Sequence, residues 1–283
     1  MYIFPIKSCA PIAVNEMNCS NLGAEYGVHL RDRVFAIVRS LPPHECVTAM
    51  QYSKMVLITP RIEDCILTID APGMNEIQVD ISKLYQSTNT LISIIQKDEV
   101  LVVDCGDEAA KWLSNYLVNK DEAFRLVFYP SNEPKPFIKP KGYLYRTAER
   151  MDTGSLHDET SYMLMNMGSF DDLNKWLEKS VGPLQFRPNI VVSGADAWSE
   201  DKWKFIKIGQ EVIFKTIQPC TRCTITTIDP STGERNKKEE PLRTLRKFRL
   251  FSNISHKCPV FGIHVGLRRA GTIRIGDNVY VSV

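Results

Sequence analysis

The chain lacks most of the features that assign a sequence to a class at once. No apolar run approaches the roughly 18 residues that a membrane-spanning helix needs, and Met1 leads straight into the strand-like Tyr2-Ile3-Phe4 without a signal peptide. The five histidines are scattered and form no His-x-x-x-His pair, which disfavours a zinc hydrolase. No strand-linked Gly-x-Gly-x-x-Gly occurs. We therefore expect a soluble protein without a nicotinamide or flavin site of its own.

The net charge is also small, and cysteines are few. The 35 basic residues against 33 acidic ones leave a charge of only +2, too small to make nucleic acid or an anionic membrane the default partner. Eight cysteines in 283 residues are too unevenly spaced for a secreted disulfide framework, which favours a reducing compartment. A chain with 43% apolar and 24% charged residues is an ordinary globular one.

The pattern of the first half predicts an antiparallel sheet or barrel. Short β-branched runs alternate with turn residues, and the expected strands are 33–38, 55–59, 65–69, 77–81, 100–103 and 124–129. Residues 107–117 carry apolar side chains at helical spacing behind Asp107 and Glu108, which predicts a helix. At 283 residues, the length suits two domains, since single domains usually have about 100 to 200 residues.

Three prolines between Pro130 and Pro136 predict a linker, and we place the domains at residues 1–133 and 134–283. Beyond it, Ser169 is expected to cap a helix whose apolar face includes Trp176. Segments 205–212 and 272–279 each alternate, break at a glycine and resume, which predicts two β-hairpins. Many short strands with few helices predict an α+β, mostly β fold with barrel architecture.

The pair Cys220-Thr221-Arg222-Cys223 admits several interpretations. Structural zinc needs two further ligands, and Cys258 has no companion at a suitable spacing. A thioredoxin-like pair should begin a helix, whereas Thr224-Ile225-Thr226-Thr227-Ile228 predicts a strand. Two buried apolar cysteines are the plain alternative. Arg222 argues against it, because a guanidinium favours the neighbouring thiolate and is costly to bury unpaired.

Three polar clusters elsewhere suit the binding of an anion. The first two have plain alternatives: an exposed lysine and an Arg-Asp-Arg surface pair for the first, and a cap or turn for the second. Lysine and arginine are charge-assisted donors to phosphate or carboxylate, and asparagine offers both a donor and an acceptor. The clusters are Lys7-Ser8 with Arg31-Asp32-Arg33, then Asp158-Glu159-Thr160-Ser161, and Arg187-Pro188-Asn189.

Four motifs in a fixed order carry a resemblance to a known family. They are Phe4-Pro5-Ile6-Lys7-Ser8-Cys9, Leu30-Arg31-Asp32-Arg33, Phe186-Arg187-Pro188-Asn189-Ile190 and Arg222-Cys223-Thr224-Ile225-Thr226-Thr227-Ile228-Asp229-Pro230. The chain resembles the MOSC-domain proteins of the molybdenum cofactor sulfurase superfamily, most closely the mitochondrial amidoxime reducing components. The likeness spans nearly the whole chain. It implies a β-rich MOSC N-terminal domain followed by a MOSC β-barrel.

The resemblance also implies a molybdenum cofactor, Mo-molybdopterin, between the two domains. By position, Cys223 is the thiolate that ligates molybdenum and the catalytic residue, and thiolate suits a soft metal. The resemblance assigns the phosphate end of the cofactor to Lys7, Ser8 and Arg33. The remaining cofactor-binding residues, around the pterin and beside the metal, are Glu159, Thr160, Ser161, Arg187, Asn189, Thr221 and Arg222. Ala10-Pro11 stands where relatives often carry Lys-Gly, and Glu159 where they often carry Asp.

The implied reaction is the two-electron reduction of N-hydroxylated compounds, such as amidoximes and hydroxylamines, to amidines and amines. Electrons would come from NADH through cytochrome b5 reductase and cytochrome b5. We expect a monomer that binds no nucleic acid. Family location at the mitochondrial outer membrane is expected, although the usual N-terminal anchor is absent from this chain.

Two other functions compete with the reductase. One is a MOSC carrier that binds or passes on sulfurated cofactor, although the pyridoxal phosphate-binding, aminotransferase-like domain that accompanies it does not fit in these residues. The other is a barrel-shaped interaction module without metal. Mixed charges between Glu234 and Arg249 favour a solvated, partly helical face over a nucleic-acid site, with a docking surface for an acidic cytochrome as the weaker alternative.

Overall fold

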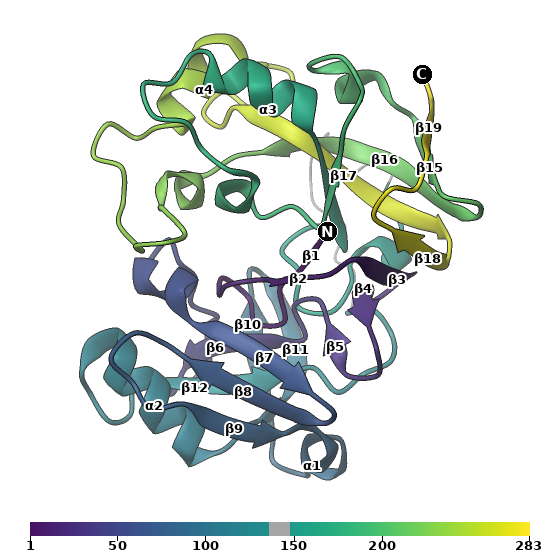
Figure 1. The fold of residues 1–283 in the computed structure, drawn as a ribbon. Coiled ribbons are helices and arrows are strands. Elements are labelled where there is room, and N and C mark those ends of the chain that lie inside the picture. Colours follow the sequence, from purple (N-terminus) through teal and green to yellow (C-terminus); the bar gives the residue numbers. More distant parts are fainter. Residues whose placement is uncertain (136–147) are drawn as a thin grey trace.

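The computed structural model describes residues 1–135 and 148–283, and within them the protein is mostly β, as predicted. Figure 1 shows two tiers: the sheets of the first half lie below, those of the second half lie above, and the N-terminus starts between them. The last proline of the expected linker, Pro136, lies outside the described residues.

The lower tier contains two antiparallel sheets. A four-stranded sheet has the order β10-β11-β12-β6, and a three-stranded sheet has the order β7-β8-β9. Their strands are β6 (Phe35–Arg39), β7 (Thr59–Glu63), β8 (Ile66–Asp70), β9 (Ile77–Asp80), β10 (Thr90–Ile95), β11 (Asp98–Asp104) and β12 (Phe124–Phe128). Alternating burial along β8 and β9 reflects the period-2 pattern that predicted them.

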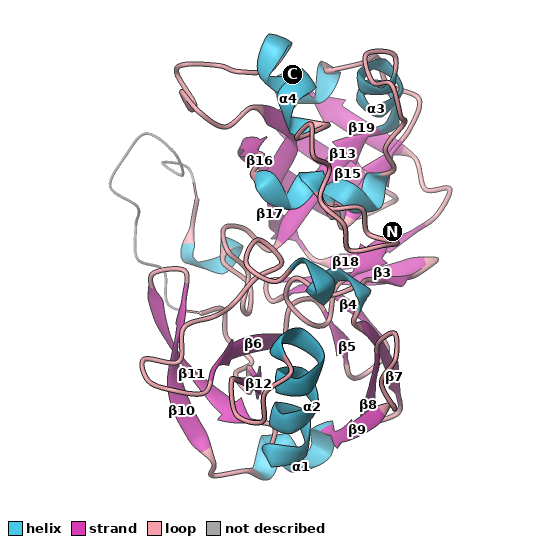
Figure 2. Ribbon diagram, turned by 90° about the vertical axis from the view of Figure 1, so that its left-hand side faces the viewer, coloured by secondary structure: helices cyan, strands magenta, loops and turns pink. Residues whose placement is uncertain are grey.

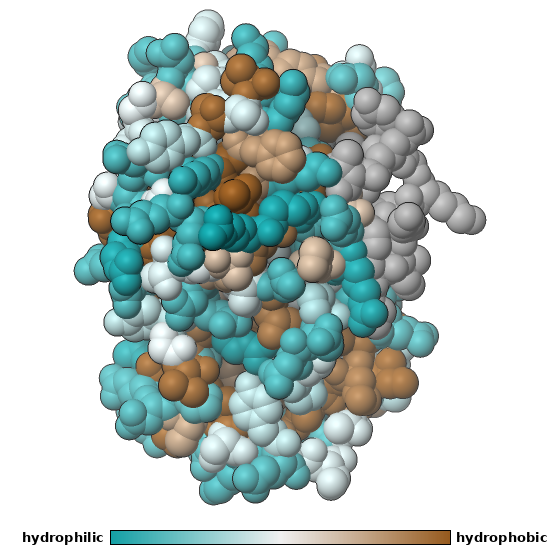
Figure 3. Space-filling model, turned by 90° about the vertical axis from the view of Figure 1, so that its right-hand side faces the viewer, coloured by the Kyte–Doolittle hydropathy of each residue, from teal (hydrophilic) through white to brown (hydrophobic). Residues whose placement is uncertain are grey.

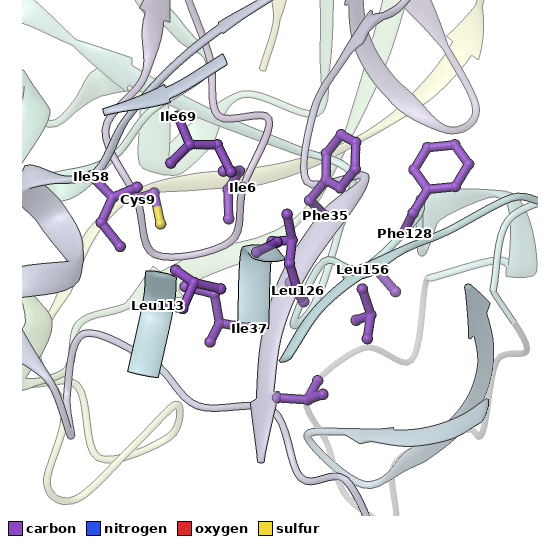
Figure 4. Packing of buried hydrophobic residues seen from close by; sticks show 14 of the residues in the cluster. Ile6, Cys9, Phe35, Ile37, Ile58, Ile69, Leu113, Leu126, Phe128 and Leu156 are labelled. Carbon is purple, nitrogen blue, oxygen red and sulfur yellow. The ribbon is translucent and has the colours of Figure 1, made fainter. Parts of the chain in front are cut away.

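Two helices complete this tier. They are α1 (Ile81–Gln86) and α2 (Asp107–Val118). Helix α2 begins with two acidic residues, ends at Asn119 in the left-handed conformation, and buries Trp112 and Leu113, as its spacing predicted. Figure 2 shows α2 lying across the sheets. Figure 4 shows the core beneath, where Leu113 lies near Ile37 and Cys9 lies beside Ile58.

The upper tier is built on a six-stranded sheet with the order β14-β13-β17-β16-β15-β19. Its strands are β13 (Tyr162–Asn166), β14 (Ile190–Val192), β15 (Phe205–Ile208), β16 (Val212–Thr221), β17 (Val260–Arg269) and β19 (Val279–Ser282). Helices α3 (Met167–Asn174) and α4 (Leu242–Phe248) pack above it (Figure 1). Strand β17 lies between β13 and β16, so its side chains are buried nearly throughout.

The start and end of the chain are joined in one sheet with the order β18-β3-β4-β5. Its strands are β3 (Glu16–Ser20), β4 (Gly23–Tyr26), β5 (Leu30–Arg31) and β18 (Gly271–Arg274), and a short pair, β1 (Tyr2–Ile3) with β2 (Ile12–Ala13), lies nearby. Ile3 and Met17 pack in the same core as Tyr162 and Ile263. The first thirty residues thus contribute to the upper core, and the boundary between residues 133 and 134 stays a prediction.

Several local predictions are wrong. Residues 53–57 form a 3-10 turn rather than part of a strand, because an apolar run alone does not distinguish the two. The 205–212 segment is a hairpin, but 272–279 is not: after Gly276, with φ of 94°, β18 pairs with β3 while β19 pairs with β15. Helix α3 is capped by Asn166, whose side chain accepts from the Gly168 N–H.

Ser169, the expected cap, lies inside α3, and its hydroxyl donates to the buried Glu200 carboxylate at 2.7 Å. Trp176 follows that helix and is 64% exposed rather than part of the apolar face, with one ring face stacked on Phe248. The surface in Figure 3 mixes hydrophilic and hydrophobic residues without one continuous apolar band. Within the described residues, no helix has the length and apolar character needed to cross a bilayer.

Candidate functional site: a cationic cleft between the two tiers

Lys7 connects the N-terminal segment to the loop that precedes β13. Its backbone N–H donates to the Phe35 carbonyl, and the side chain is almost fully buried. The ammonium donates to the Leu156 carbonyl at 3.2 Å and to the Asp158 carboxylate at 2.5 Å. The Asp158 side chain keeps 45% of its surface exposed, and the Lys7 charge beside it lowers the pKa of that carboxyl to about 2. Ser8 follows in a left-handed turn with φ of 68° and is likewise buried.

Asp32 holds the second cluster together from a fully buried position. One carboxylate oxygen accepts from the Phe4 N–H at 2.7 Å, and the other bonds His157 Nε2 at 2.8 Å and the Arg33 guanidinium. Burial would raise the pKa of Asp32, but Arg33 and these hydrogen bonds lower it to about 2. The exposed Arg-Asp-Arg alternative is therefore wrong, because these side chains form an internal charge network.

Arg33 and Arg187 converge on one aromatic ring. Their guanidinium carbons lie 4.9 and 4.3 Å from the centroid of Phe4. Arg187 follows the 3-10 turn η3 (Pro183–Phe186) in the left-handed conformation, with φ of 58°. Its Nη2 is buried without a hydrogen-bond partner among the described residues. Burial, followed by repulsion from Arg33, lowers the pKa of Arg187 to about 9. Two neighbouring cations with a spare donor form a site that favours an anion.

Ser161 and Asn189 lie deeper. The Ser161 hydroxyl is buried and has no partner in the described part of the chain, which leaves it free for a ligand. Asn189 already uses both ends of its amide, because its oxygen accepts from the Met163 N–H at 3.2 Å and its nitrogen donates to the Tyr2 carbonyl at 3.3 Å. Asn189 thus fixes β13 to the N-terminal strand, in addition to any contact with a ligand.

The cysteine pair lies where β16 ends. Thr221 is the last residue of that strand, and Cys223 precedes the 3-10 turn η5 (Thr224–Thr227), so the predicted strand over 224–228 is wrong. Thr226 and Thr227 direct their hydroxyls to the carbonyls of Cys223 and Thr224, which stabilises the turn locally. Cys223 is partly exposed, whereas Cys220 is buried. Burial raises the pKa of the Cys223 thiol.

Arg222 is buried, but it is not unpaired. Its Nε donates to the Phe261 carbonyl at 2.8 Å, Nη1 to the Phe186 carbonyl at 3.1 Å, and Nη2 to the Met163 sulfur at 3.4 Å. The guanidinium therefore ties β16 to β17 and η3. Its charge also acts on Cys220, whose thiol pKa is lowered by Arg222 and His264 against the opposing effect of burial.

Glu159 and Thr160, which the resemblance assigned to the pterin, meet a residue that the sequence did not single out. His264 Nε2 lies 2.6 Å from Glu159 Oε2, and His264 Nδ1 lies 2.9 Å from Thr160 Oγ1. A lone histidine inside the apolar strand β17 has no sequence signal of function. His157 was missed for a related reason, and so were the pairings of Asp158 and Asp32, two residues of the predicted polar clusters: the partners are far away in the chain.

The donor set fits an anionic cofactor that carries a soft metal. Lys7, Arg33 and Arg187 place three cations against the two carboxylates of Asp32 and Asp158, so the local balance is positive. One guanidinium N–H of Arg187 and the Ser161 hydroxyl have no hydrogen-bond partner among the described residues. A partly exposed thiol stands at the end of β16, and thiolate is a soft-metal ligand. Among the described residues, no group of three His, Cys, Asp or Glu side chains could hold a metal alone.

A cavity of about 270 Å³ reaches this region between the tiers. It is lined by residues of both halves of the chain, including Tyr2, Ala10, Leu184, Arg187 and Pro230. A second cavity of about 540 Å³ shares Ala10 and Pro230 with it. A further hollow of about 590 Å³ lies elsewhere, beside α4, and is lined by both acidic and basic residues. We assign the candidate site to the cavity of about 270 Å³, because Arg187 lines it.

Comparison with known proteins agrees with the resemblance. The MOSC N-terminal beta barrel domain matches residues 1–120, and the MOSC domain matches residues 152–280. Mitochondrial amidoxime-reducing component 1 of Mus musculus is 37% identical over 287 residues, covering 99% of this chain and 81% of that protein. Component 2 of Bos taurus is 35% identical, covering 100% and 82%. Component 2 of Homo sapiens is 35% identical, covering 99% and 82%.

Solved structures match more distantly. YiiM from Geobacillus stearothermophilus is 14% identical and covers 44% of this chain and 54% of its own, with a TM-score of 0.31, which is too low to support an argument. The two domain matches and the curated relatives carry the assignment instead. Since nearly the whole chain aligns with those relatives at 35–37% identity, it belongs to the MOSC-domain family of amidoxime-reducing components.

Proposed function

We propose that this protein binds a molybdenum cofactor and reduces N-hydroxylated compounds, such as amidoximes and hydroxylamines, to amidines and amines. The observation that carries the proposal is the pair Arg33 and Arg187 on Phe4, with a buried N–H of Arg187 that lacks a partner in the described chain. Keeping such a donor unpaired costs about 1–3 kcal/mol. An anionic ligand removes that cost, and the phosphate-bearing pterin of the molybdenum cofactor is such a ligand.

Each residue has a role that its surroundings support. Lys7 and Arg33, held in place by Asp158 and Asp32, would bind the phosphate as charge-assisted donors. Arg187 and Ser161 would donate to the pterin from buried positions. Thr221 and Arg222 shape the end of β16 and so orient Cys223. When bound, the molybdenum supplies the two-electron chemistry, and Cys223 supplies its thiolate ligand.

The reaction consumes two electrons and two protons and releases water: R–NOH + 2e⁻ + 2H⁺ gives R–NH + H₂O. The chain has no nicotinamide or flavin fingerprint, so we propose that the electrons come from NADH through cytochrome b5 reductase and cytochrome b5. We propose further that the protein acts as a monomer. The relatives are named as mitochondrial proteins, and we propose the same compartment for this chain.

Metal analysis tests the proposal. Protein produced where the cofactor is available should carry about one molybdenum per chain and should reduce benzamidoxime when supplied with cytochrome b5 and its reductase. Cys223→Ser should lose both the metal and the activity, because serine is a poor ligand for a soft metal. Cys258→Ser is the matched control, since Cys258 is also a partly exposed free cysteine.

Two outcomes would count against the proposal in different ways. Full molybdenum retention in Cys223→Ser would refute the assignment of the ligand. A wild-type protein that is loaded with molybdenum but does not turn over N-hydroxylated substrates would refute the reductase activity, and it would favour the cofactor-carrier function instead.

A further inference from the structure

His264 sits at the centre of the upper sheet with both ring nitrogens engaged. Strand β17 places it opposite Met163 of β13 and opposite Gln218 of β16, and only 8% of the residue is exposed. Its Nε2 lies 2.6 Å from the Glu159 carboxylate. Its Nδ1 lies 2.9 Å from the Thr160 hydroxyl. No role for His264 follows from the sequence, since it is an isolated histidine in an apolar strand.

The hydrogen bonds determine the charge of this ring. The Thr160 hydroxyl donates its only proton to the Tyr162 carbonyl at 3.0 Å, so it can only accept from His264 Nδ1. The Glu159 carboxylate forms an ion pair with His264 Nε2 at 2.6 Å, and an ionised carboxylate has no proton to give to that nitrogen. Both ring nitrogens therefore carry a proton, and His264 is an imidazolium. Burial opposes this charge, but Cys220 and Glu159 outweigh it and raise the pKa of His264 to about 10.

The charged groups around His264 form a path with two ends. Glu159 comes from the loop before β13 and keeps 31% of its side chain exposed, so it can exchange protons with water. Cys220, in the neighbouring strand β16, lies close enough to His264 for the charges of the two groups to act on each other. Arg222 lies beyond Cys220 and also favours its thiolate. Cys220 precedes the proposed metal ligand Cys223 by three residues and its charge acts on that thiol, so this end of the path lies toward the reaction site.

We propose that His264 is the proton donor of this site, replenished from water through Glu159 and connected to the reaction site through Cys220. The proposal rests on the proposed function. Cleavage of the N–O bond leaves a hydroxyl that must be protonated to leave as water. One of the two protons comes from His264 by way of Cys220, and Glu159 returns it from solvent. The second proton comes from water, and the two electrons come from the metal centre.

The first experiment measures the charge of His264 without turnover. NMR of ¹⁵N-labelled histidine side chains, with the His264 signal assigned by its loss in His264→Gln, reports the protonation of both nitrogens against pH. We expect His264 to remain an imidazolium at pH 7.5, and Glu159→Gln to lower its pKa by removing the paired charge. A neutral ring at pH 7.5 in the wild type overturns the proposal.

The second experiment uses the loaded enzyme. His264→Gln should keep its molybdenum and lose about 100-fold or more in kcat, the range typical of a general acid. Glu159→Gln keeps the test valid if His264→Gln, in a strand, misfolds. Glu159 lies in a loop, and glutamine is nearly isosteric with glutamate. The alkaline limb of the kcat–pH profile of Glu159→Gln should move to lower pH, in step with the lowered His264 pKa that NMR reports. A merely structural role would not cause this shift. The exposed His256→Gln is the control.

The failures of the two proposals differ. If wild-type protein binds no molybdenum or reduces no N-hydroxylated compound, the proposed function is refuted, and so is the proposal that His264 is the proton donor. If the wild type is loaded and active, and His264→Gln is loaded and equally active, only the proton donor is refuted.

Discussion

Arg187→Met should have opposite effects on stability and on cofactor binding. In the cofactor-free protein, the unpaired Nη2 of Arg187 costs about 1–3 kcal/mol, and repulsion from Arg33 adds to that cost. The contact of the Arg187 guanidinium with the Phe4 ring offsets this cost by about 1 kcal/mol. Methionine fills similar space without charge, so we expect the free energy of unfolding to rise by about 1–2 kcal/mol, or the Tm by about 2–8 °C.

Thermal denaturation of the cofactor-free protein and molybdenum analysis of the loaded protein measure the two effects. Retained molybdenum should fall sharply in Arg187→Met, although the protein is more stable. Arg222→Met is the matched control: its guanidinium donates to the Phe261 and Phe186 carbonyls, and each charge-assisted bond is worth about 1.5–3 kcal/mol. That variant should lose about 3 kcal/mol or more. A destabilised Arg187→Met would show that the protein itself uses this guanidinium, and the anion-site reasoning would be refuted.

Acid should destabilise the protein in two steps. Burial lowers the pKa of His157 to about 4, so its contribution is complete above the unfolded value of 6.5 and is lost as the pH falls through 4. Asp32, with its pKa near 2, adds a contribution that is lost below about pH 4. Urea unfolding at pH 7, 5 and 4 should show this slope, and His157→Gln should flatten it; an unchanged slope would contradict the assignment. Gly154→Ala should destabilise the protein in thermal melts, because φ is +64° and the added Cβ would lie 2.4 Å from His157 Nδ1, whereas the open Gly182→Ala should not.

The fold was largely predictable because its strands are amphipathic or uniformly apolar. Strands β8 and β9 and helix α2 follow the period of their side chains, so local pattern and structure agree. Pairing between distant segments was not predictable. The 272–279 segment looks like a hairpin locally, yet β18 and β19 join different sheets, because β3 and β15 offer edges that no local pattern reveals.

The cations of the site could be predicted from the sequence, but which residues pair with them could not. Lys7, Arg33 and Arg187 stood out as donors, and the structure brings Arg33 and Arg187 onto Phe4. The pairings that hold them were not predicted, since Asp32 meets His157 across 125 positions and Lys7 meets Asp158 across 151. Such pairs depend on the tertiary fold. Arg222 shows the converse error: proximity to Cys223 suggested an anion partner, whereas backbone carbonyls satisfy it.

The pairing of β3 with β18 has a consequence for how the chain folds during its synthesis. Residues Glu16–Ser20 leave the ribosome long before their partner strand Gly271–Arg274, since Asn18 and Thr272, which lie opposite each other, are 254 positions apart. Until then one edge of β3 has unpaired backbone groups, and Met17 lacks the cover of Ile273. In the nascent chain, the first strands of the upper core therefore remain exposed to chaperones and to mispairing until β18 has been translated.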